Sequence, residues 1–367
     1  MTIKFLDSKR LEGVAGDLTT KGVTSGTGGW KELGRTTLNG TGDTILVSGL
    51  ANKRYFMVLA DGLPSGNIGA NIILNSDTSA SSYSQTASGN GATDTPLVDQ
   101  TYYKLDTIAG NGFEVFGVGY IANLANKEKL MQFNTLKHDG NGTNVQVKRI
   151  ESVGKWDNTS DAVSSVSLFN HAGGDYASGS EVVVLGFDPL DTHTDNFWEE
   201  LSSTTVSSNT SSFTTETFAV KKYLWIQIYN TSKASGVNQI LRFNGSTGNE
   251  YNCRTNTNGA NPTNQSSSSD YEANDYSGIL LNHDPSASGL ATGMFSNVFM
   301  INVSDREKMI MVNGVSGWTY QGAGVVPARF ANVGKWEITG DPAGLVSSVQ
   351  ITGVVASGSV VKVWGHD

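Results

Sequence analysis

The chain has 367 residues, of which 38% are hydrophobic and 16% are charged, and its formal net charge at pH 7 is −9. This length predicts more than one domain, and the negative charge argues against a protein that binds nucleic acid or an anionic membrane surface. The single cysteine, Cys253, excludes an intramolecular disulfide and a metal site built from several cysteines.

Residues 1–28 form the first predicted segment, and no other part of the sequence resembles them. We predict an N-terminal arm that is extended by itself and is ordered by a neighbouring subunit. Its apolar runs are short, so we do not expect a secretory signal peptide. No window of the chain reaches the roughly 18 apolar residues that a membrane-spanning helix needs.

The rest of the chain repeats one unit. The stretch "GWKELGRTTL" around Trp30 matches "FWEELSSTTV" around Trp198, and "RIESVGKW" ending at Trp156 matches "RFANVGKW" ending at Trp336. The stretch "ASGSEVVVLGFD" matches "ASGSVVKVWGHD", with which the chain ends. Because the matches keep one order and a nearly constant spacing, we predict two homologous domains. The predicted boundaries are 29–188 for the first domain, 189–196 for a short linker, and 197–367 for the second domain.

Apolar residues in the matched blocks alternate with a period of two, as in half-buried strands. Phe56 and Val58 of "YFMVLA" lie on one face, and their counterparts in the second copy are also apolar, so this face is the predicted core face. The same argument assigns six further residues to the two cores: Leu224, Ile226, Val182, Val184, Val361 and Val363. The alternate positions, such as Val183 and Leu185, are predicted to face solvent or the other domain.

The first copy contains eight or nine strand-like blocks, and no segment has a sustained helical period. We therefore predict an all-β protein with two tandem antiparallel β-sandwiches, and eight strands point to jelly rolls. An immunoglobulin-like sandwich is less favoured, because the Cys–Trp–Cys pattern is absent. The blocks are 30–37, 44–49, 55–60, 70–74, 113–122, 130–135, 145–152, 163–169 and 181–186. Three polar tracts are predicted to be loops: 75–96, 202–217 and 252–278.

The sequence carries little catalytic or metal-binding signal. None of the five histidines lies in a metal-binding spacing, and each has turn-forming neighbours, so solvated loops are predicted for all of them. The turn "FNGSTGNEYN" offers Asn244, Ser246 and Glu250 as oxygen donors to calcium, although it lacks the dense carboxylates of an EF-hand loop. A plain glycine-rich turn is the favoured alternative, and no other cofactor is predicted.

Aromatic residues outside the repeated positions are the candidates for interaction with a partner. Trp318 and Tyr320 alternate onto one face of "VSGWTYQGAG", where they would stack on a sugar or fill a pocket in another subunit. Ordinary packing is the alternative for this pair. Tyr271 and Tyr276 lie in the tract 252–278, which we predict to contact a subunit or receptor because long loops at matching positions of a sandwich often bind partners.

Several stretches resemble a group of structural proteins from environmental, largely marine, viral genomes. They are "IKFLDSKRLEG", "KKYLWIQIY", "LRFNGSTGNEY", "VGKW" and "SGSVVKVWGHD". In that group a jelly-roll-like unit ending in "GS-x-V-x-V-x-G-x-D" recurs, sometimes in tandem. The resemblance covers nearly the whole chain, although the first copy has "IILNSDTSASSY" where the second has "LRFNGSTGNEY".

The resemblance implies a virion structural protein, which would be a capsid shell, decoration, spike or fibre subunit. Such a protein is made in the host cytoplasm without a signal peptide and ends in the virion. The implied partners are further copies of the chain in a homotrimer or larger assembly, other virion proteins and a host surface glycan, without nucleic acid or a membrane span. A carbohydrate-binding adhesin or receptor-binding protein is the second hypothesis. A polysaccharide-active enzyme ranks last, because no pair of catalytic carboxylates is visible, and we do not expect an enzyme.

Overall fold

The computed structural model describes most of the chain from Gly29 onward. The described residues are 29–106, 114–138, 140, 142, 145–189, 191, 193, 195–233, 239–256, 270–281, 291–316, 327–337 and 344–367. Their regular structure consists of β-strands, and all strand pairs within the sheets are antiparallel. None of these residues forms a helix that could cross a membrane. The predicted arm, 1–28, lies outside the described residues, so it stays a prediction.

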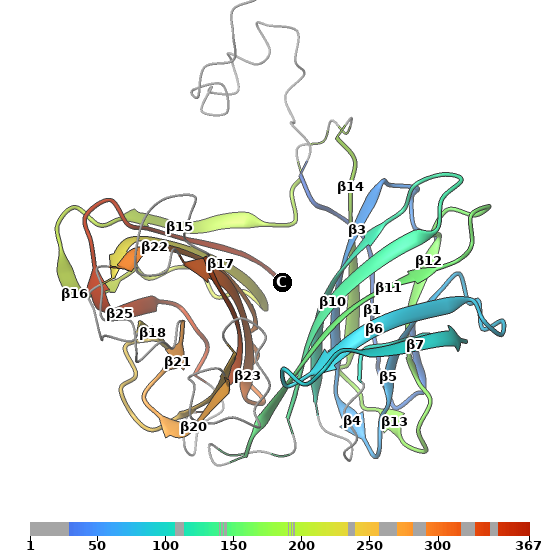
Figure 1. The fold of residues 1–367 in the computed structure, drawn as a ribbon, viewed down its shortest axis with the longest axis horizontal. Helices are drawn as coiled ribbons and strands as arrows, with labels where there is room; N and C mark the ends of the chain where they lie inside the picture. The colour runs from blue at the N-terminus through green and yellow to red at the C-terminus, as the bar shows by residue number, and fades with distance from the viewer. Residues whose placement is uncertain are drawn as a thin grey trace, which may run out of the picture.

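The first half of the structure is a sandwich of two main sheets (Figure 1). The eight-stranded sheet has the order β1(Lys31–Thr37), β14(Glu181–Phe187), β3(Tyr55–Gly62), β9(Val115–Ala122), β10(Lys129–His138), β11(Val147–Trp156), β6(Tyr83–Gly89), β7(Thr95–Gln100). The four-stranded sheet has the order β2(Thr44–Ser48), β12(Ser165–Asn170), β5(Ala70–Leu74), β8(Tyr103–Lys104). A small ribbon pairs β4(Pro64–Ser65) with β13(Asp175–Tyr176).

The second half repeats the strand order of the first half. Its eight-stranded sheet has the order β15(Glu199–Thr205), β26(Val360–His366), β17(Tyr223–Lys233), β22(Ala291–Ile301), β23(Lys308–Ser316), β24(Ala328–Trp336), β19(Tyr251–Asn256), β20(Asp270–Tyr276). Its four-stranded sheet has the order β16(Thr210–Thr214), β25(Val349–Val355), β18(Ile240–Phe243), β21(Ile279–Leu280). The prediction of an all-β chain with two antiparallel sandwich-like halves is therefore confirmed.

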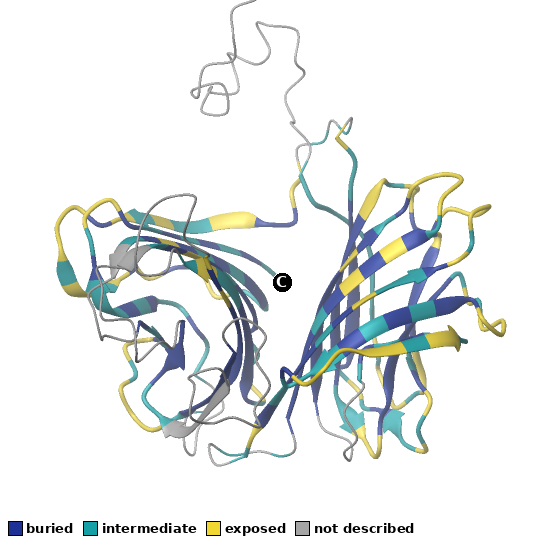
Figure 2. Ribbon diagram, viewed as in Figure 1, coloured by how far each residue is buried: buried dark blue, intermediate teal, exposed yellow. Residues whose placement is uncertain are grey.

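The core of each sandwich contains the residues that the repeat assigned to it. Phe56 and Val58 are fully buried in the first half, and Leu224 and Ile226 are fully buried in the second half. The four valines predicted on the closing strands are buried in the same two cores. Alternation is visible along β10, where buried and exposed residues follow one another (Figure 2).

The predicted polar loops are partly strands, which corrects the sequence analysis. The tract 75–96 contains β6 and the start of β7, and the tract 252–278 contains most of β19, all of β20 and a long segment outside the described residues. The tract 202–217 likewise contains the end of β15 and all of β16. Strands near a sheet edge need an inward side chain only at alternate positions, so Tyr83 and Ala87 suffice to anchor β6 while its other residues stay polar.

The two halves pack through the outer faces of their eight-stranded sheets. Val183 and Leu185, on the face opposite the first core, are fully buried in a cluster with Tyr223, Phe299 and Met311 of the second half. This face was predicted to lie against solvent or against the other domain, and the structure shows that it lies against the other half. In Figure 1 the halves stand side by side, with the C-terminus of the chain between them.

Candidate assembly face

Within the interface between the halves, each sheet contributes one patch of buried residues. We name the first-half residues Asp61, Phe116, Leu136 and Arg149 contact patch 1; they lie directly opposite one another on β3, β9, β10 and β11. We name the second-half residues Tyr223, Phe299, Met309 and Val333 contact patch 2. The exposed fraction of every residue in both patches is 6% or less, from 0% for Asp61 to 6% for Phe299.

A partly buried cation, Arg306, joins the halves by binding two buried carboxyl groups. Arg306 of the second half donates hydrogen bonds to Oδ2 of Asp61, at 2.6 Å, and to Oε1 of Glu114, at 2.7 Å. Burial raises the pKa of Asp61 to about 7, although the charge of Arg306 opposes this shift. Burial by itself would lower the pKa of Arg306, but the two carboxyl groups raise it. An ionic link of this kind fixes the relative position of the halves, because removal of one partner leaves a buried charge uncompensated.

Glu181 is the centre of a second polar link. It accepts hydrogen bonds from the hydroxyl of Tyr223, at 2.8 Å, from Nζ of Lys222, at 3.0 Å, and from the hydroxyl of Thr37. Burial would raise the pKa of Glu181, but the bond from Thr37 and the charge of Lys222 lower it below its usual value. In these two links the first half supplies the carboxyl groups, and the second half supplies the cations Arg306 and Lys222 and the phenol of Tyr223.

Residues of the hairpin between β10 and β11 form a third set of contacts with the second half. Nζ of Lys335 lies 2.8 Å from Oε2 of Glu307 and donates a 3.0 Å hydrogen bond to the carbonyl of Gly140. The backbone N–H of Gly142 donates to Glu307 at 2.5 Å. Arg149 donates a 2.6 Å bond to the carbonyl of Ala331. His138, predicted to be solvated, is instead buried at the base of this hairpin, 3.6 Å from Glu114.

The outer face of the first half continues beyond the interface as an exposed apolar surface. Its central residues are Tyr55, Tyr120, Leu130 and Val153, with exposed fractions of 38%, 37%, 59% and 54%, and we name them open patch 1. They line a groove of about 820 Å³. An apolar surface that is open and contiguous in this way is typical of a contact site.

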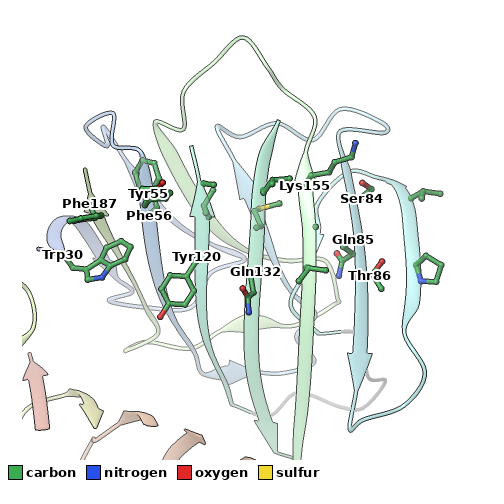
Figure 3. A pocket seen from close by; sticks show the side chains of 18 residues that line it. Trp30, Tyr55, Phe56, Ser84, Gln85, Thr86, Tyr120, Gln132, Lys155 and Phe187 are labelled. Carbon is green, nitrogen blue, oxygen red and sulfur yellow. The ribbon is translucent and has the colours of Figure 1, made fainter. Parts of the chain in front are cut away.

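Figure 3 shows the groove with aromatic residues at one end and polar residues at the other. Trp30 packs against Phe187 and Tyr120 with ring centroids 5.7 and 6.2 Å apart, and Tyr55 stacks on Phe187 at 6.3 Å. Gln132 lies in the middle of the groove. The polar end carries Ser84, Thr86 and Lys155.

The outer face of the second half also has an exposed end. Tyr229, Phe295, Val315 and Arg329 lie directly opposite one another on β17, β22, β23 and β24, and we name them open patch 2. The exposed fractions of the first three are 49%, 38% and 43%. The side chain of Arg329 is 56% exposed and lies 3.6 Å from Glu151 of the first half. Each half thus has one covered and one uncovered patch on the same sheet face.

The predicted calcium ligands are engaged in hydrogen bonds. The side-chain oxygen of Asn244 accepts bonds from the N–H groups of Ser347 and Ser348, and Ser246 donates to Glu250, which also accepts from the indole N–H of Trp336. The first half has a similar arrangement, in which Asn75 accepts from Ser164 and Ser165 and the indole of Trp156 donates to Asp77. Because both halves contain these bonds, they support a structural role for the turn, and calcium binding at Asn244, Ser246 and Glu250 stays a prediction.

The four aromatic residues predicted to contact a partner do not form one site in the described part of the chain. Trp318 and Tyr320 lie outside them, in the segment between β23 and β24. Tyr271 belongs to β20, at the edge of the eight-stranded sheet, and its side chain is not described. Tyr276 is partly buried and packs against the second core. These four assignments remain predictions.

Sequence reasoning missed the two open patches, although a signal for them was present. All four positions of open patch 1 and of contact patch 2 are apolar or aromatic, and the repeat aligns them one to one. Such a match on the face opposite the core marks a surface that both halves keep apolar. It does not tell which copy is covered, because this depends on how the halves are joined.

Comparisons with known proteins add no family. No family model matches the chain, and no curated protein matches it. Among solved structures, the chain has 10% identity and a TM-score of 0.15 to a chain described under "Unveiling the Mechanism Behind the in-meso Crystallization of Membrane Proteins", with 80% of this chain and 88% of that chain covered. At this TM-score nothing about the fold or function follows from the match.

Proposed function

We propose that this chain is a virion structural protein that self-assembles through the outer faces of its eight-stranded sheets. The observation that carries the proposal is that open patch 1 is exposed while the equivalent residues of the second half are buried against a sandwich. The virion setting comes from the sequence resemblance, and the partners in this proposal are further copies of the chain, as a homotrimer or larger assembly, and other virion proteins. In this proposal the chain is not an enzyme and is located in the virion.

We also propose that each half is a jelly roll. The order β1-β14-β3-β9 faces the order β2-β12-β5-β8, which supports two interlocked Greek keys of eight strands. The strands β10, β11, β6 and β7 then extend one sheet of the jelly roll. The same orders in the second half support a double jelly roll, which suits pseudo-symmetric assembly because matched domains can occupy quasi-equivalent positions.

Two measurements test the proposal separately. Light scattering and electron microscopy of the purified chain should show a defined oligomer, whereas a monomer at every concentration would contradict self-assembly. Mass spectrometry of particles banded on a density gradient, from a culture whose virus encodes the chain, should find it with the capsid. If its peptides remain in the soluble fraction, the virion assignment is wrong.

A glycan-binding adhesin is the second candidate, because the groove of open patch 1 combines aromatic rings with amide, hydroxyl and ammonium groups. Trp30, Tyr55 and Tyr120 offer faces for sugar stacking, and Gln132 and Lys155 offer hydrogen bonds. A glycan array with the wild-type chain tests this candidate, with Tyr120→Ala as the loss-of-binding variant and Leu46→Ala, on the opposite sheet, as the control. Binding that is unchanged in Tyr120→Ala would place the glycan elsewhere.

A further inference from the structure

We infer that open patch 1 of one chain binds open patch 2 of a second copy, head to tail, in the manner in which the two halves bind each other within a chain. The inference rests on the self-assembly part of the proposed function and names the surfaces that perform it. Its basis is a position-by-position comparison of the two halves.

Open patch 1 corresponds residue by residue to contact patch 2. Tyr55 aligns with Tyr223 and Tyr120 aligns with Phe299, because the strands β3 and β9 have the same sheet positions as β17 and β22. Leu130 aligns with Met309 in the same way, and Val153 aligns with Val333. The second-half residues are at most 6% exposed. Open patch 1 therefore has the same positions and apolar character as contact patch 2, which already packs against a sandwich within the chain.

Open patch 2 corresponds in the same way to contact patch 1. Phe295 aligns with Phe116, Val315 with Leu136, and Arg329 with Arg149. Phe116 and Leu136 are 1% and 0% exposed, whereas Phe295 and Val315 are 38% and 43% exposed. The two open patches thus match the two sides of the internal junction. Open patch 1 lies on the first half of the chain and open patch 2 lies on the second half.

An ion pair at the margin of the junction is also repeated. Lys335 and Glu307 are 2.8 Å apart, with side chains 1% and 7% exposed, and they bind the backbone of the β10–β11 hairpin. Lys155 and Glu128, at the equivalent positions of the first half, are 2.7 Å apart and 41% exposed each. The first half therefore presents the same pair, without a hairpin bound to it among the described residues.

The two junctions differ in charge. Asp61, Glu114 and Glu181 hold the cations of the internal junction, but the second half has Tyr229, Gly293 and Val360 at these positions. The junction between chains consequently lacks the buried ionic links and depends on apolar contact. Its association constant should change little with salt, because screening acts on charges.

A head-to-tail contact uses each open patch once per chain, so it produces a closed ring or an open filament. In a closed ring every sandwich would have the same two kinds of neighbour. A contact of open patch 1 with itself would instead give a two-fold dimer and would leave open patch 2 exposed.

Two charge variants test this arrangement. Leu130→Glu with Val153→Glu disables open patch 1, and Phe295→Glu with Val315→Glu disables open patch 2. All four residues are at least 38% exposed, so the fold should persist in each variant. Each variant alone should lose self-association by about a hundredfold or more, because apolar anchors dominate binding. Leu46→Glu with Val220→Glu, exposed apolar residues outside the patches, is the matched control and should assemble like the wild type.

Mixing the two variants provides the decisive measurement. One intact patch of each kind remains in the mixture, so analytical ultracentrifugation should show a 1:1 heterodimer and no larger species. If the open patch 2 variant alone still assembles like the wild type, or if the mixture stays monomeric while the wild type assembles, the inference is wrong. A wild-type chain that is monomeric contradicts both the inference and self-assembly, whereas particle association tests the virion role independently. If a glutamate variant loses its cooperative melting transition, Leu130→Gln with Val153→Thr replaces it on the first half, and Phe295→Gln with Val315→Thr replaces it on the second.

Discussion

The phenolic hydroxyl of Tyr223, at the start of β17, donates a 2.8 Å hydrogen bond to Oε1 of Glu181, at the start of β14 in the other half. The equivalent residue of the first half, Tyr55, has an exposed ring in open patch 1. One residue type at one position of a repeated fold therefore has two environments. This difference makes each half a control for the other in mutational tests.

Tyr223→Phe should lower the free energy of unfolding by about 2 kcal/mol, because it removes a hydrogen bond to a buried carboxylate. Tyr55→Phe changes the same group at the equivalent exposed position and should leave stability within about 0.5 kcal/mol of the wild type. Urea denaturation of both variants measures the difference. Equal effects at the two positions would mean that the bond to Glu181 contributes nothing.

The repeat allowed the cores to be predicted from the sequence, because buried positions must stay apolar in both copies. Trp156 and Trp336 recur for this reason, and each is buried beside a tyrosine. The strands β6 and β19 escaped prediction because their composition is that of a loop. Pairing with strands on both sides stabilises them, with β11 and β7 for β6 and with β24 and β20 for β19. The open patches escaped because coverage of Tyr223 but not of Tyr55 results from the packing of the halves, which no local pattern encodes.

Removal of Arg306 should weaken the attachment of the halves strongly. At pH 8, above the pKa of Asp61, Arg306→Met leaves Asp61 and Glu114 buried without their cation, at a cost of about 3–5 kcal/mol in unfolding free energy. Lys127 has the equivalent position in the first half and is exposed, so Lys127→Met should be nearly neutral. Thermal melting followed by tryptophan fluorescence suits this test, since Trp198 and Trp225 lie in the interface cluster. A small loss with Arg306→Met would show that water reaches the two carboxyl groups.

Asp61 should make stability depend on pH. Its pKa in the folded chain is raised to about 7 by burial, above the ordinary value of 3.8, so the folded state binds more protons than the unfolded state between these values. The stabilising contribution of the protonated group is present below about pH 4 and is lost as the pH rises through about 7, by at most about 1.4 kcal/mol per pH unit.

Asp61→Asn should remove this slope, which urea denaturation between pH 4 and pH 8 can measure. Asp94→Asn, at an exposed position, should keep the wild-type slope. A slope that is identical in Asp61→Asn and in the wild type would assign the pH dependence to other groups.

Val184 tests the assignment of the core face. It is fully buried in the first core, so Val184→Asp places an unpaired charge there and should cost several kcal/mol, enough to unfold the first half. Val98 is 64% exposed, and Val98→Asp should melt like the wild type. Circular dichroism on both variants makes the comparison, and a folded Val184→Asp would mean that the register of β14 is wrong.

Variants in the turn between β18 and β19 can distinguish a structural role from a calcium-binding role. Glu250 accepts the indole N–H of Trp336 at 3.3 Å, and Asp77 accepts that of Trp156 at 2.7 Å, so both halves satisfy a buried tryptophan with a carboxylate from the loop before the next strand. Glu250→Ala should therefore lower the unfolding free energy by about 1–3 kcal/mol, the cost of an unsatisfied buried donor, as should Asp77→Ala. The loss of unfolding free energy should not depend on calcium in either variant. The first half forms the same indole–carboxylate bond, although it lacks the turn sequence proposed to bind calcium. Melting curves with millimolar calcium and with a chelator decide the matter: a wild-type melting temperature that rises with calcium and a Glu250→Ala variant that does not respond would establish a calcium site at Asn244, Ser246 and Glu250 instead.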